Sequence, residues 1–397
     1  MSLRLGFHYH IPMTRDAEGR LRTPGYQGRF LDSLARHCEQ LVCFLHSPSP
    51  TDTSPLDYVI QSDNVVWVDI GAHASVPRRM LGARKVACLI RPWRTQLDAM
   101  LIRGPSPLLP VVAGAVDSLP TSLLLVGDYL AGIDDLPQPR WRKEAIRLWA
   151  RWNYHQQMKV ARRSLTFVNS RRLYNELRPF VENLVETRTT TLTSADFYER
   201  EDTCTQRPIR LLYTGRMDRA KGLLQMVEAL ALLVDSGEDV VLDLVGWPQK
   251  GDPILDEVQA LARGKGVAER VFYHGYKPVG PELFAYYKQA DIYVIASMSS
   301  EGFPRTIWEA MAHGLPVVAT RVGSISLFLE ESRAALLIAP RDSEALAQAI
   351  QEVLLSASLR KELMNNGFKL VKENTLEARA REMIAHLEAL VSGQKPS

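Results

Sequence analysis

SEGFPRTIWEAMAHGLPVVAT, residues 300–320, is the stretch that decides the fold of this chain. An apolar run before it, residues 291–296, and the run 316–320 at its end are both typical of buried parallel strands. Between them, Pro304 suits the first turn of a helix, where a missing N–H costs nothing, and Gly314 suits the end of that helix. The stretch therefore predicts a strand–helix–strand crossing in an open α/β sheet.

Two carboxylates belong to this crossing, because Glu301 lies on the predicted loop and Glu309 lies one to two turns inside the predicted helix. Ligands of open α/β sheets bind beyond the carboxyl ends of the strands, where the free amides of Gly302, Phe303 and Thr306 are expected. Such amides can hold phosphate, while carboxylates accept hydrogen bonds from the vicinal hydroxyls of a ribose or hexose. The pattern favours a sugar nucleotide; the alternative is an ordinary strand-to-helix junction with two solvated glutamates.

The composition is that of a globular protein. With 397 residues, 46% of them hydrophobic and 23% charged, the chain is long enough for two domains with full cores. Its four cysteines show no C-x-x-C pair and no zinc-ligand spacing, which favours reduced thiols in the cytoplasm. The first residues lack the apolar region of a secretion signal. Residues 108–133 are the most apolar, but proline and aspartate interrupt them, so buried strands explain them better than a membrane span.

Positive charge is concentrated in the first half of the chain. Residues 1–200 contain 26 Lys and Arg against 19 Asp and Glu, whereas residues 201–397 contain 22 against 26. A basic half of this kind is expected to meet an anionic partner or surface. No recognised nucleic-acid module and no pattern of stacking aromatics accompany the charge, so we do not expect nucleic acid as the partner.

The N-terminal half begins with a predicted strand, residues 3–9, a long loop that carries Gly25 and Gly28, and a predicted helix, residues 30–38. A glycine loop between a strand and a helix lets the backbone approach a phosphate. The same glycines are also compatible with a simple turn. The loop is therefore a candidate phosphate contact with a purely structural alternative.

Further strands are predicted at residues 41–45, 65–70, 87–90 and 123–126. Asp128 follows the last of them directly. The carboxyl end of a parallel strand is where binding and catalytic residues collect, but an aspartate in this position also serves as a helix or turn cap. Asp128 is therefore a candidate site residue.

Residues 140–163 combine basic and indole side chains. They carry eight cations against one anion, Glu144, and include Trp141, Trp149 and Trp152. This is the composition of an interfacial helix, whose aromatic rings lie at the headgroup level while its cations meet anionic lipid. The alternative is a domain helix with Trp149 in the core and a solvated basic face.

The second half follows a polar stretch, residues 193–208, that is typical of an interdomain linker. Strands are predicted at 209–214, 240–245, 271–274, 292–296, 317–320 and 335–338, most of them separated by helical patterns. This alternation favours a doubly wound parallel sheet. Arg216 and Lys221 follow the first of these strands and should lie on the same sheet edge as Glu301, where two cations could neutralise a diphosphate leaving group. Taken alone, they would be surface charges.

These residues resemble the family-four glycosyltransferases of GT-B architecture. The matching motifs are Gly215-Arg216 with Lys221-Gly222, Gly246 at a strand end, His274-Gly275-Tyr276, and the Glu301-x7-Glu309 pair within EGFP and EAMAHGLPVVA. The motifs cover residues 209–340, and over residues 1–200 the likeness is only topological. The resemblance implies an α/β protein with two doubly wound Rossmann-like domains facing across a cleft: an acceptor-binding domain, residues 1–195, and a nucleotide-sugar-binding domain, residues 209–375. The final segment, residues 376–397, would pack back on the first domain.

The resemblance also implies a role for each motif residue. Arg216 and Lys221 would bind the donor phosphates, Glu309 the ribose hydroxyls, and Tyr276 the base. Glu301, with the amides of Gly302, Phe303 and Thr306, would hold the donor sugar and phosphate, and Pro304 would shape that turn. Gly25 or Gly28 would close on the phosphates from the other domain, and Asp128 would contact the donor sugar or the incoming hydroxyl.

This chain departs from the family pattern at three of these places. Tyr26-Gln27 separates two glycines that are usually adjacent, Asp128 follows a strand near whose end many members carry a histidine, and Trp247-Pro248 follows Gly246 where a second glycine is common. The roles of these loops are therefore the least secured by the motifs.

The function that the resemblance implies is transfer of a hexosyl group from a nucleotide-diphosphate sugar to an acceptor hydroxyl, on a glycan or lipid-linked glycan, with retention of configuration. No cofactor and no metal are expected, since cations replace magnesium and no Asp-x-Asp occurs among these sites. Two alternatives are a nucleotide-sugar epimerase of the same architecture and a non-catalytic member held at the membrane by the basic helix. The expected location is the cytoplasm, with peripheral binding to the inner membrane face if residues 140–163 dock on anionic lipid.

Overall fold

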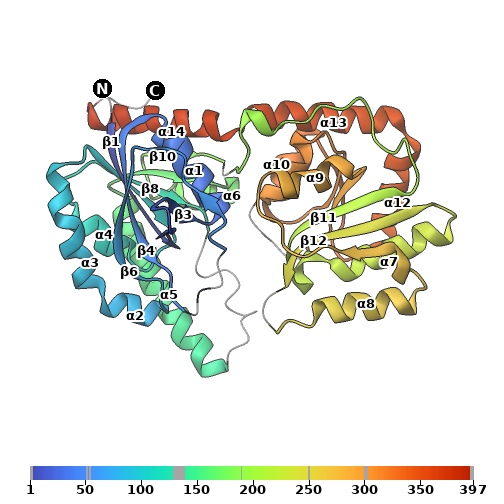
Figure 1. The fold of residues 1–397 in the computed structure, drawn as a ribbon, viewed down its shortest axis with the longest axis horizontal. Coiled ribbons are helices and arrows are strands. Elements are labelled where there is room, and N and C mark those ends of the chain that lie inside the picture. Colours follow the sequence, from blue (N-terminus) through green and yellow to red (C-terminus); the bar gives the residue numbers. More distant parts are fainter. Residues whose placement is uncertain are drawn as a thin grey trace. The chain divides into compact units, whose positions relative to one another are not determined.

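The computed structural model describes residues 3–50, 52, 55–127, 139–188, 190–248, 251–298 and 303–393. The chain divides into two compact units. Unit 1 comprises Met1–Thr189 and Leu376–Ser397, and unit 2 comprises Thr190–Thr375. Each unit is a parallel sheet covered by helices (Figure 1).

The sheet of unit 1 has seven strands in the order β10-β9-β8-β7-β1-β4-β6, and every neighbouring pair is parallel. Chain order runs outward from β1 in both directions, which makes the sheet doubly wound. The strands are β1 (Leu3–Pro12), β4 (Cys38–Ser47), β6 (Val65–Ala72), β7 (Ala99–Gly104), β8 (Thr121–Leu125), β9 (Leu165–Val168) and β10 (Leu184–Glu186). A small antiparallel sheet is formed by β2 (Thr14–Arg15), β3 (Leu21–Thr23) and β5 (Tyr58–Val59).

Helices cover both faces of this sheet because successive side chains of a strand point to opposite faces. Phe7 belongs to the core shared with α1 (Gly25–Ala35) and α14 (Leu376–Val391), which pack against each other. Phe44 belongs to the core shared with α3 (Ala83–Ile90), α4 (Leu109–Ala115) and α5 (Arg140–Ala161). The remaining short elements are α2 (Val76–Leu81), η1 (Arg91–Thr95) and α6 (Arg171–Leu177).

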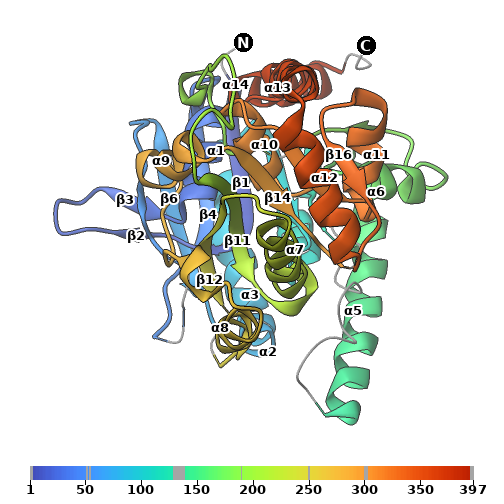
Figure 2. The same cartoon turned by 90° about the vertical axis from the view of Figure 1, so that its right-hand side faces the viewer.

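Helix α5 is the longest element of unit 1. Its second half is buried through Ala150, Asn153, Gln157 and Met158, whereas its first turns extend away from the sheet (Figures 1 and 2). The predicted helix over residues 140–163 is therefore present, ending two residues earlier.

The sheet of unit 2 has six parallel strands in the order β13-β12-β11-β14-β15-β16. They are β11 (Ile209–Met217), β12 (Val240–Pro248), β13 (Val271–Tyr273), β14 (Ile292–Ile295), β15 (Val317–Thr320) and β16 (Leu336–Ile338). The larger helices are α7 (Leu223–Asp235), α8 (Ile254–Gly264), α9 (Pro281–Gln289), α10 (Arg305–Ala312), α11 (Gly323–Ser332), α12 (Ser343–Leu355) and α13 (Ala357–Lys372). Single turns form η2 (Ser194–Asp196), η3 (Arg219–Lys221) and η4 (Ala268–Arg270). Both sheets confirm the predicted α/β class with doubly wound parallel sheets.

Two secondary-structure predictions are wrong. Residues 87–90, predicted as a strand, end helix α3, because Val86 and Ile90 lie one turn apart and are both buried on the same helical face. Part of the apolar stretch 108–133 also forms a helix, α4, and only residues 121–125 form a buried strand, β8. Residues 128–133 lie outside the described residues.

Residues 193–208, predicted as a linker, are part of unit 2. The Arg200 guanidinium donates to the carbonyls of Tyr287 and Ala290, at 2.9 and 2.8 Å. Asp202 accepts two hydrogen bonds from Arg360. These polar side chains therefore hold the segment on unit 2 instead of solvating a linker.

Candidate functional site

Three glycines bring the carboxyl ends of β11, β12 and β14 together. Gly215, Gly222 and Gly246 have φ values of 138°, 72° and 148°. A Cβ on Gly246 would lie 1.8 Å from the carbonyl oxygen of Gly215, and one on Gly222 would lie 2.0 Å from that of Ala296. Only glycine allows both the conformation and the close approach. The motif glycines thus shape the edge of the sheet on which the predicted cations lie.

Arg216 and Lys221 are both at this edge. The Arg216 side chain is 50% exposed, and its Nε donates to Asp218 Oδ2 at 2.7 Å. The Tyr213 hydroxyl donates to the Arg216 carbonyl at 2.7 Å, which fixes the end of β11. Lys221 ends η3 and is half-buried. Asp218 is a site residue that the sequence reasoning missed, although a carboxylate two residues from a phosphate-binding arginine was a visible signal.

Glu309 is buried inside α10, with only 3% of its surface exposed. Its Oε1 accepts from the Thr191 hydroxyl at 2.7 Å, and its Oε2 accepts from the Tyr287 hydroxyl at 2.8 Å. The Tyr287 hydroxyl also contacts Thr214 Oγ1 at 2.5 Å. Burial raises the pKa of Tyr287 well above its usual value, and the nearby Glu309 charge adds to this. The carboxylate is therefore held in one orientation by two neutral donors, and it keeps lone pairs for further donors.

His313 secures the end of the same helix. Its Nδ1 donates to the Glu309 carbonyl at 2.7 Å, and its ring stacks on Tyr287 with centroids 5.3 Å apart. Burial lowers the pKa of His313 to about 4, so the ring is neutral at pH 7. This histidine thus supports the buried network around Glu309.

A second buried carboxylate lies on β12. Asp243 Oδ1 is 2.6 Å from His274 Nε2, and the Arg210 guanidinium donates to both Asp243 oxygens at 2.9 and 2.8 Å. The His274-Gly275-Tyr276 motif was recognised in the sequence, but Asp243 and Arg210 were not. The signal that could have found them is a charged residue inside a predicted buried strand.

Two exposed aromatic residues stand at the ends of neighbouring strands. Trp247 is near the end of β12 and Tyr276 follows β13, and their rings meet edge to face with centroids 5.2 Å apart. Exposed aromatic faces of this kind can stack a heterocyclic base. The base contact predicted for Tyr276 stays a prediction, and Trp247 is an additional candidate for it.

The remaining predicted residues of the crossing motif are only partly visible. Glu301 and Gly302, like Asp128 in unit 1, lie outside the described residues. Phe303 is buried against Trp308 and Phe328, and Pro304 immediately precedes α10. Thr306 lies in the first turn of α10. The roles predicted for these residues stay predictions.

Gly25 and Gly28 lie in the first turn of α1, and their predicted loop is therefore wrong. The Gly25 amide donates to Asp57 Oδ1 at 2.8 Å, and a Cβ on Gly28 would lie 2.2 Å from the Tyr58 ring. The two glycines thus permit close packing against Asp57 and Tyr58. Their predicted contact with phosphates stays a prediction.

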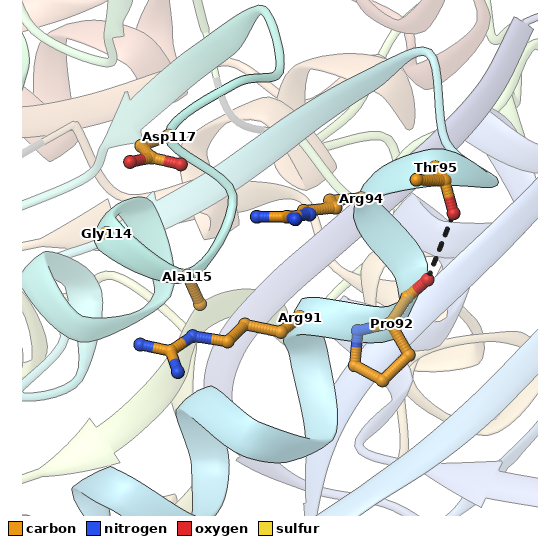
Figure 3. Close-up of a pocket in the computed structure, with 7 residues that line it drawn as sticks. All are labelled: Arg91, Pro92, Arg94, Thr95, Gly114, Ala115 and Asp117. Atoms are coloured by element: carbon orange, nitrogen blue, oxygen red, sulfur yellow. Dashed lines mark hydrogen bonds between the residues drawn. The ribbon is translucent and has the colours of Figure 1, made fainter.

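A cavity of about 540 Å³ lies in unit 1 at the edge of the sheet where β7 and β8 begin (Figure 3). Figure 3 shows Arg91 and Arg94 extending toward the side formed by Gly114, Ala115 and Asp117. Its lining residues are Arg91, Pro92, Arg94, Thr95, Gly114, Ala115 and Asp117. Because ligands of such sheets bind at the carboxyl edge, we assign no substrate to this cavity.

Two properties were searched across the described residues. None of their helices is both long and apolar enough to cross a membrane. They also contain no group of three or more His, Cys, Asp or Glu residues arranged to hold a metal ion.

Part of the chain has relatives with similar sequences. Residues 208–356 match the family described as glycosyl transferases group 1. The D-inositol 3-phosphate glycosyltransferase of Corynebacterium jeikeium is 32% identical over 151 residues, which are 37% of this chain and 36% of that protein. The phosphatidyl-myo-inositol mannosyltransferase of Mycobacterium leprae is 28% identical over 187 residues, 47% of this chain and 48% of that protein. The chain thus matches between about a third and a half of the length of these relatives.

Solved structures resemble the whole chain. Sucrose-phosphate synthase from Thermosynechococcus elongatus superimposes with a TM-score of 0.70 at 19% identity and covers 99% of this chain and 100% of that one. Anabaena HepE in complex with UDP gives a TM-score of 0.70 at 16% identity and covers 98% of this chain and 100% of that one. At such identities the likeness shows the fold. The predicted resemblance is confirmed: through residues 208–356 this chain belongs to the glycosyl transferases group 1 family, and it has the two-unit GT-B fold of these structures.

Proposed function

We propose that this protein is a glycosyltransferase that moves a hexosyl group from a nucleotide-diphosphate sugar to an acceptor hydroxyl with retention of configuration. The observation that carries the proposal is the placement of Arg216, Lys221 and the Glu309 network on one carboxyl edge of the unit 2 sheet. Anabaena HepE, which has the same fold, has been crystallised with UDP and with UDP-glucose. That protein supports a nucleotide sugar as the donor here.

The diphosphate of the donor replaces Asp218 as the partner of Arg216. The ion pair between the two side chains is half exposed, and surface pairs contribute only about 0–1 kcal/mol. A guanidinium that grips phosphate through two parallel hydrogen bonds forms a stronger contact. Asp218 thus keeps Arg216 oriented until the donor binds and then gives it up at little cost.

The nucleoside binds beside Glu309. Thr191 and Tyr287 hold the Glu309 carboxylate in place, so little reorganisation is needed when the ribose hydroxyls donate to its remaining lone pairs. The base lies against Tyr276 and Trp247, whose rings are exposed at the ends of β13 and β12.

Transfer breaks the bond between the anomeric carbon and the diphosphate and forms a bond to the acceptor oxygen on the same face of the sugar. Arg216 and Lys221 stabilise the charge that develops on the leaving diphosphate as an oxocarbenium-like centre forms. Glu301 orients the sugar and no residue acts as a covalent nucleophile. Asp128 contacts the donor sugar or the incoming hydroxyl, and neither a cofactor nor a metal takes part.

Calorimetric titration of UDP, GDP and ADP, and of their hexose conjugates, tests this proposal in metal-free buffer. One nucleotide should bind, and Arg216→Ala should weaken it by about tenfold or more, since hydrogen bonds to charged groups contribute about 1.5–3 kcal/mol. Arg219→Ala is the matched control, because Arg219 lies on η3 but pairs with Glu257. Absence of binding by every nucleotide would reject the donor site.

Product analysis separates this function from the epimerase alternative. With the donor alone, an epimerase releases free sugar or converts the donor into its epimer, whereas a transferase consumes donor only when an acceptor is added. Donor turnover without acceptor would favour the epimerase.

We also propose that helix α5 binds the protein to an anionic membrane and that the acceptor is a lipid-linked glycan. Trp141, Leu148 and Trp152 have exposed fractions of 73%, 65% and 49%. Their spacings of seven and four residues place them on one face of the helix. That face is opposite the buried Ala150, Gln157 and Ala161 (Figure 2).

Cations border this apolar face of α5. They are Arg140, Arg142, Arg151, Lys159, Arg162 and Arg163, all of which are exposed. An apolar stripe bordered by arginines matches a surface of acyl chains and anionic headgroups, and it gives a water-exposed helix no advantage. The arrangement supports peripheral binding at the inner face of a membrane.

Vesicle sedimentation tests this location. The protein should bind vesicles that contain phosphatidylglycerol and should bind neutral phosphatidylcholine vesicles much less. Trp141→Ser combined with Trp152→Ser should reduce binding, whereas Phe180→Ser, at another exposed apolar site of unit 1, should not. Equal binding to both vesicle types, or none, would contradict the proposal.

A further inference from the structure

Unit 1 contains a cluster of four histidines that the donor chemistry does not use. His8 and His10 are on β1, His46 is near the end of β4, and His73 directly follows β6. The rings of His46 and His73 have centroids 5.7 Å apart. Because the three strands are parallel neighbours, the cluster lies toward their carboxyl ends, where open α/β sheets bind ligands.

Backbone carbonyls fix which ring nitrogens carry hydrogen. His8 Nδ1 donates to the Phe44 carbonyl at 2.9 Å, and its Nε2 therefore accepts from the Ser106 hydroxyl at 3.1 Å. His46 Nδ1 donates to the Gly71 carbonyl at 3.0 Å. Burial lowers the pKa of His8 to about 4 and that of His46 to about 3, so both rings are neutral at pH 7. The Nε2 atom of His46 is consequently a lone-pair acceptor.

That acceptor has no partner among the described residues. His46 is 1% exposed, and its Nε2 is buried without a hydrogen bond. His10 Nδ1 is buried in the same state. Buried polar atoms are nearly always hydrogen-bonded, so two unpartnered ring nitrogens in one cluster point to a ligand. A lone pair on His46 requires a ligand that donates, such as a hydroxyl group.

A cation accompanies these rings. Arg79, on α2, is close enough for its charge to lower the pKa of His8, His10 and His46. Since His8 and His46 are neutral, Arg79 carries the positive charge of the cluster. The described residues include no set of three ligands suited to a metal, so metal binding does not explain the cluster.

We propose that this histidine cluster binds the glycosyl acceptor and that the acceptor is a phosphorylated polyol. A hydroxyl of the polyol donates to His46 Nε2, and the phosphate pairs with Arg79. A polyol supplies the donor that the imidazole needs, and a phosphate supplies the anion that the guanidinium needs. Naming the ligand as the acceptor depends on the proposed function, whereas its binding does not. The phosphorylated polyol is either a free molecule or the headgroup of a lipid.

Titration of the full chain with matched probes tests the inference. myo-Inositol 1-phosphate should bind, and myo-inositol should bind at least about tenfold more weakly because it lacks the charged contact. Arg79→Gln should weaken the phosphorylated probe by a similar factor. Arg78→Gln, at the exposed neighbouring position of α2, should leave its affinity unchanged. Equal losses in the two variants, or equal affinities for the two probes, would overturn the proposal.

Histidine ring ¹⁵N spectra of the unsubstituted protein give a test that does not depend on folding of a variant. Saturation with myo-inositol 1-phosphate should shift the Nε2 resonance of His46 and leave that of His313, in unit 2, unchanged. No shift at His46 would overturn the proposal. Phosphatidylinositol vesicles compared with phosphatidylcholine vesicles, probed with Arg79→Gln, distinguish a lipid headgroup from a free ligand.

Nucleotide titration of the same samples separates this inference from the proposed function. If UDP or another nucleotide binds but the inositol probes fail, the acceptor inference is wrong and the donor site stands. If the phosphorylated probe binds through Arg79 but no nucleotide binds, the histidine cluster is a binding site and the proposed transfer is wrong.

Discussion

At the scale of single residues, the buried carboxylate of Glu309 shows how far motif recognition reaches. The spacing of Glu301 and Glu309 and the glycine-arginine motif identified Glu309, Arg216 and Lys221 from the sequence. The partners Thr191 and Tyr287 could not be identified, because they come from segments 118 and 22 residues away and carry no charge or periodic signal. Sequence patterns thus found the charged groups, and the fold supplied the hydrogen bonds that orient them.

Substitution of Tyr287 by phenylalanine should destabilise unit 2. The change removes the donor to Glu309 Oε2 and leaves a buried carboxylate oxygen without it, which costs about 1–3 kcal/mol. Urea unfolding would measure the loss. Tyr286→Phe is the control, since Tyr286 is only partly buried and its ring contacts persist in phenylalanine. Equal stability of the two variants would show that the hydroxyl contributes nothing.

Acid should destabilise unit 2 partly through His313. Its pKa is lowered by burial from the usual 6.5 to about 4, so the unfolded chain binds the proton first. The stability that His313 contributes is complete above pH 6.5 and is lost as the pH falls from 6.5 to about 4. Urea unfolding between pH 7 and 4 should show a shallower pH dependence for His313→Asn, whose amide can still donate to the Glu309 carbonyl. An unchanged slope would contradict the prediction.

At the scale of elements, strands were easier to predict than the segments between them. The strands of unit 2 have apolar runs bounded by glycine or proline, and each was predicted within a few residues of its observed bounds. Residues 87–90 were mistaken for a strand because a four-residue apolar run has no visible period, and only its pairing with Val86 reveals a helix. The start of α1 was missed because glycine is rare inside helices, yet Gly28 is needed for contact with Tyr58.

The crossing between β11 and β12 should not tolerate a methyl group at Gly246. A Cβ there would lie 1.8 Å from the Gly215 carbonyl oxygen, and the φ of 148° is unfavourable for alanine. Gly246→Ala should cost several kcal/mol, on the order of 2–4, and weaken nucleotide binding because Arg216 follows Gly215. Gly264→Ala, in α8 with open space around it, should change stability by about 1 kcal/mol or less. Unfolding and calorimetry of both variants would check this.

At the scale of the whole molecule, the chain returns to its first unit at its last helix. α14 buries Leu376, Met383, Ile384 and Leu387 in the core that contains Phe7. The sequence predicted this helix and its bounds, but the acceptor side of unit 1 could not be predicted, because the recognised motifs lie in unit 2. The unpartnered nitrogens of His10 and His46 became visible only when distant strands were brought together.

Leu387→Ala should therefore destabilise unit 1 and leave unit 2 intact. Removal of a fully buried leucine side chain costs about 2–5 kcal/mol. Hydrogen exchange should show faster opening of β1 and α1, with protection of β11 and β12 unchanged. Glu388→Ala, at an exposed position of the same helix, is the control. Loss of protection in both units would show that the two unfold as one body.

The return of α14 to unit 1 has a consequence for protein engineering. Thr190–Thr375 is one continuous segment, flanked on both sides by chain that belongs to the other unit. Unit 2 is thus inserted into unit 1, and only two junctions join them. A chimera could exchange this whole cassette for the corresponding segment of a relative by two cuts, near residues 190 and 375, without interrupting either sheet. Donor preference would then travel with the insert, while acceptor preference would stay with the host.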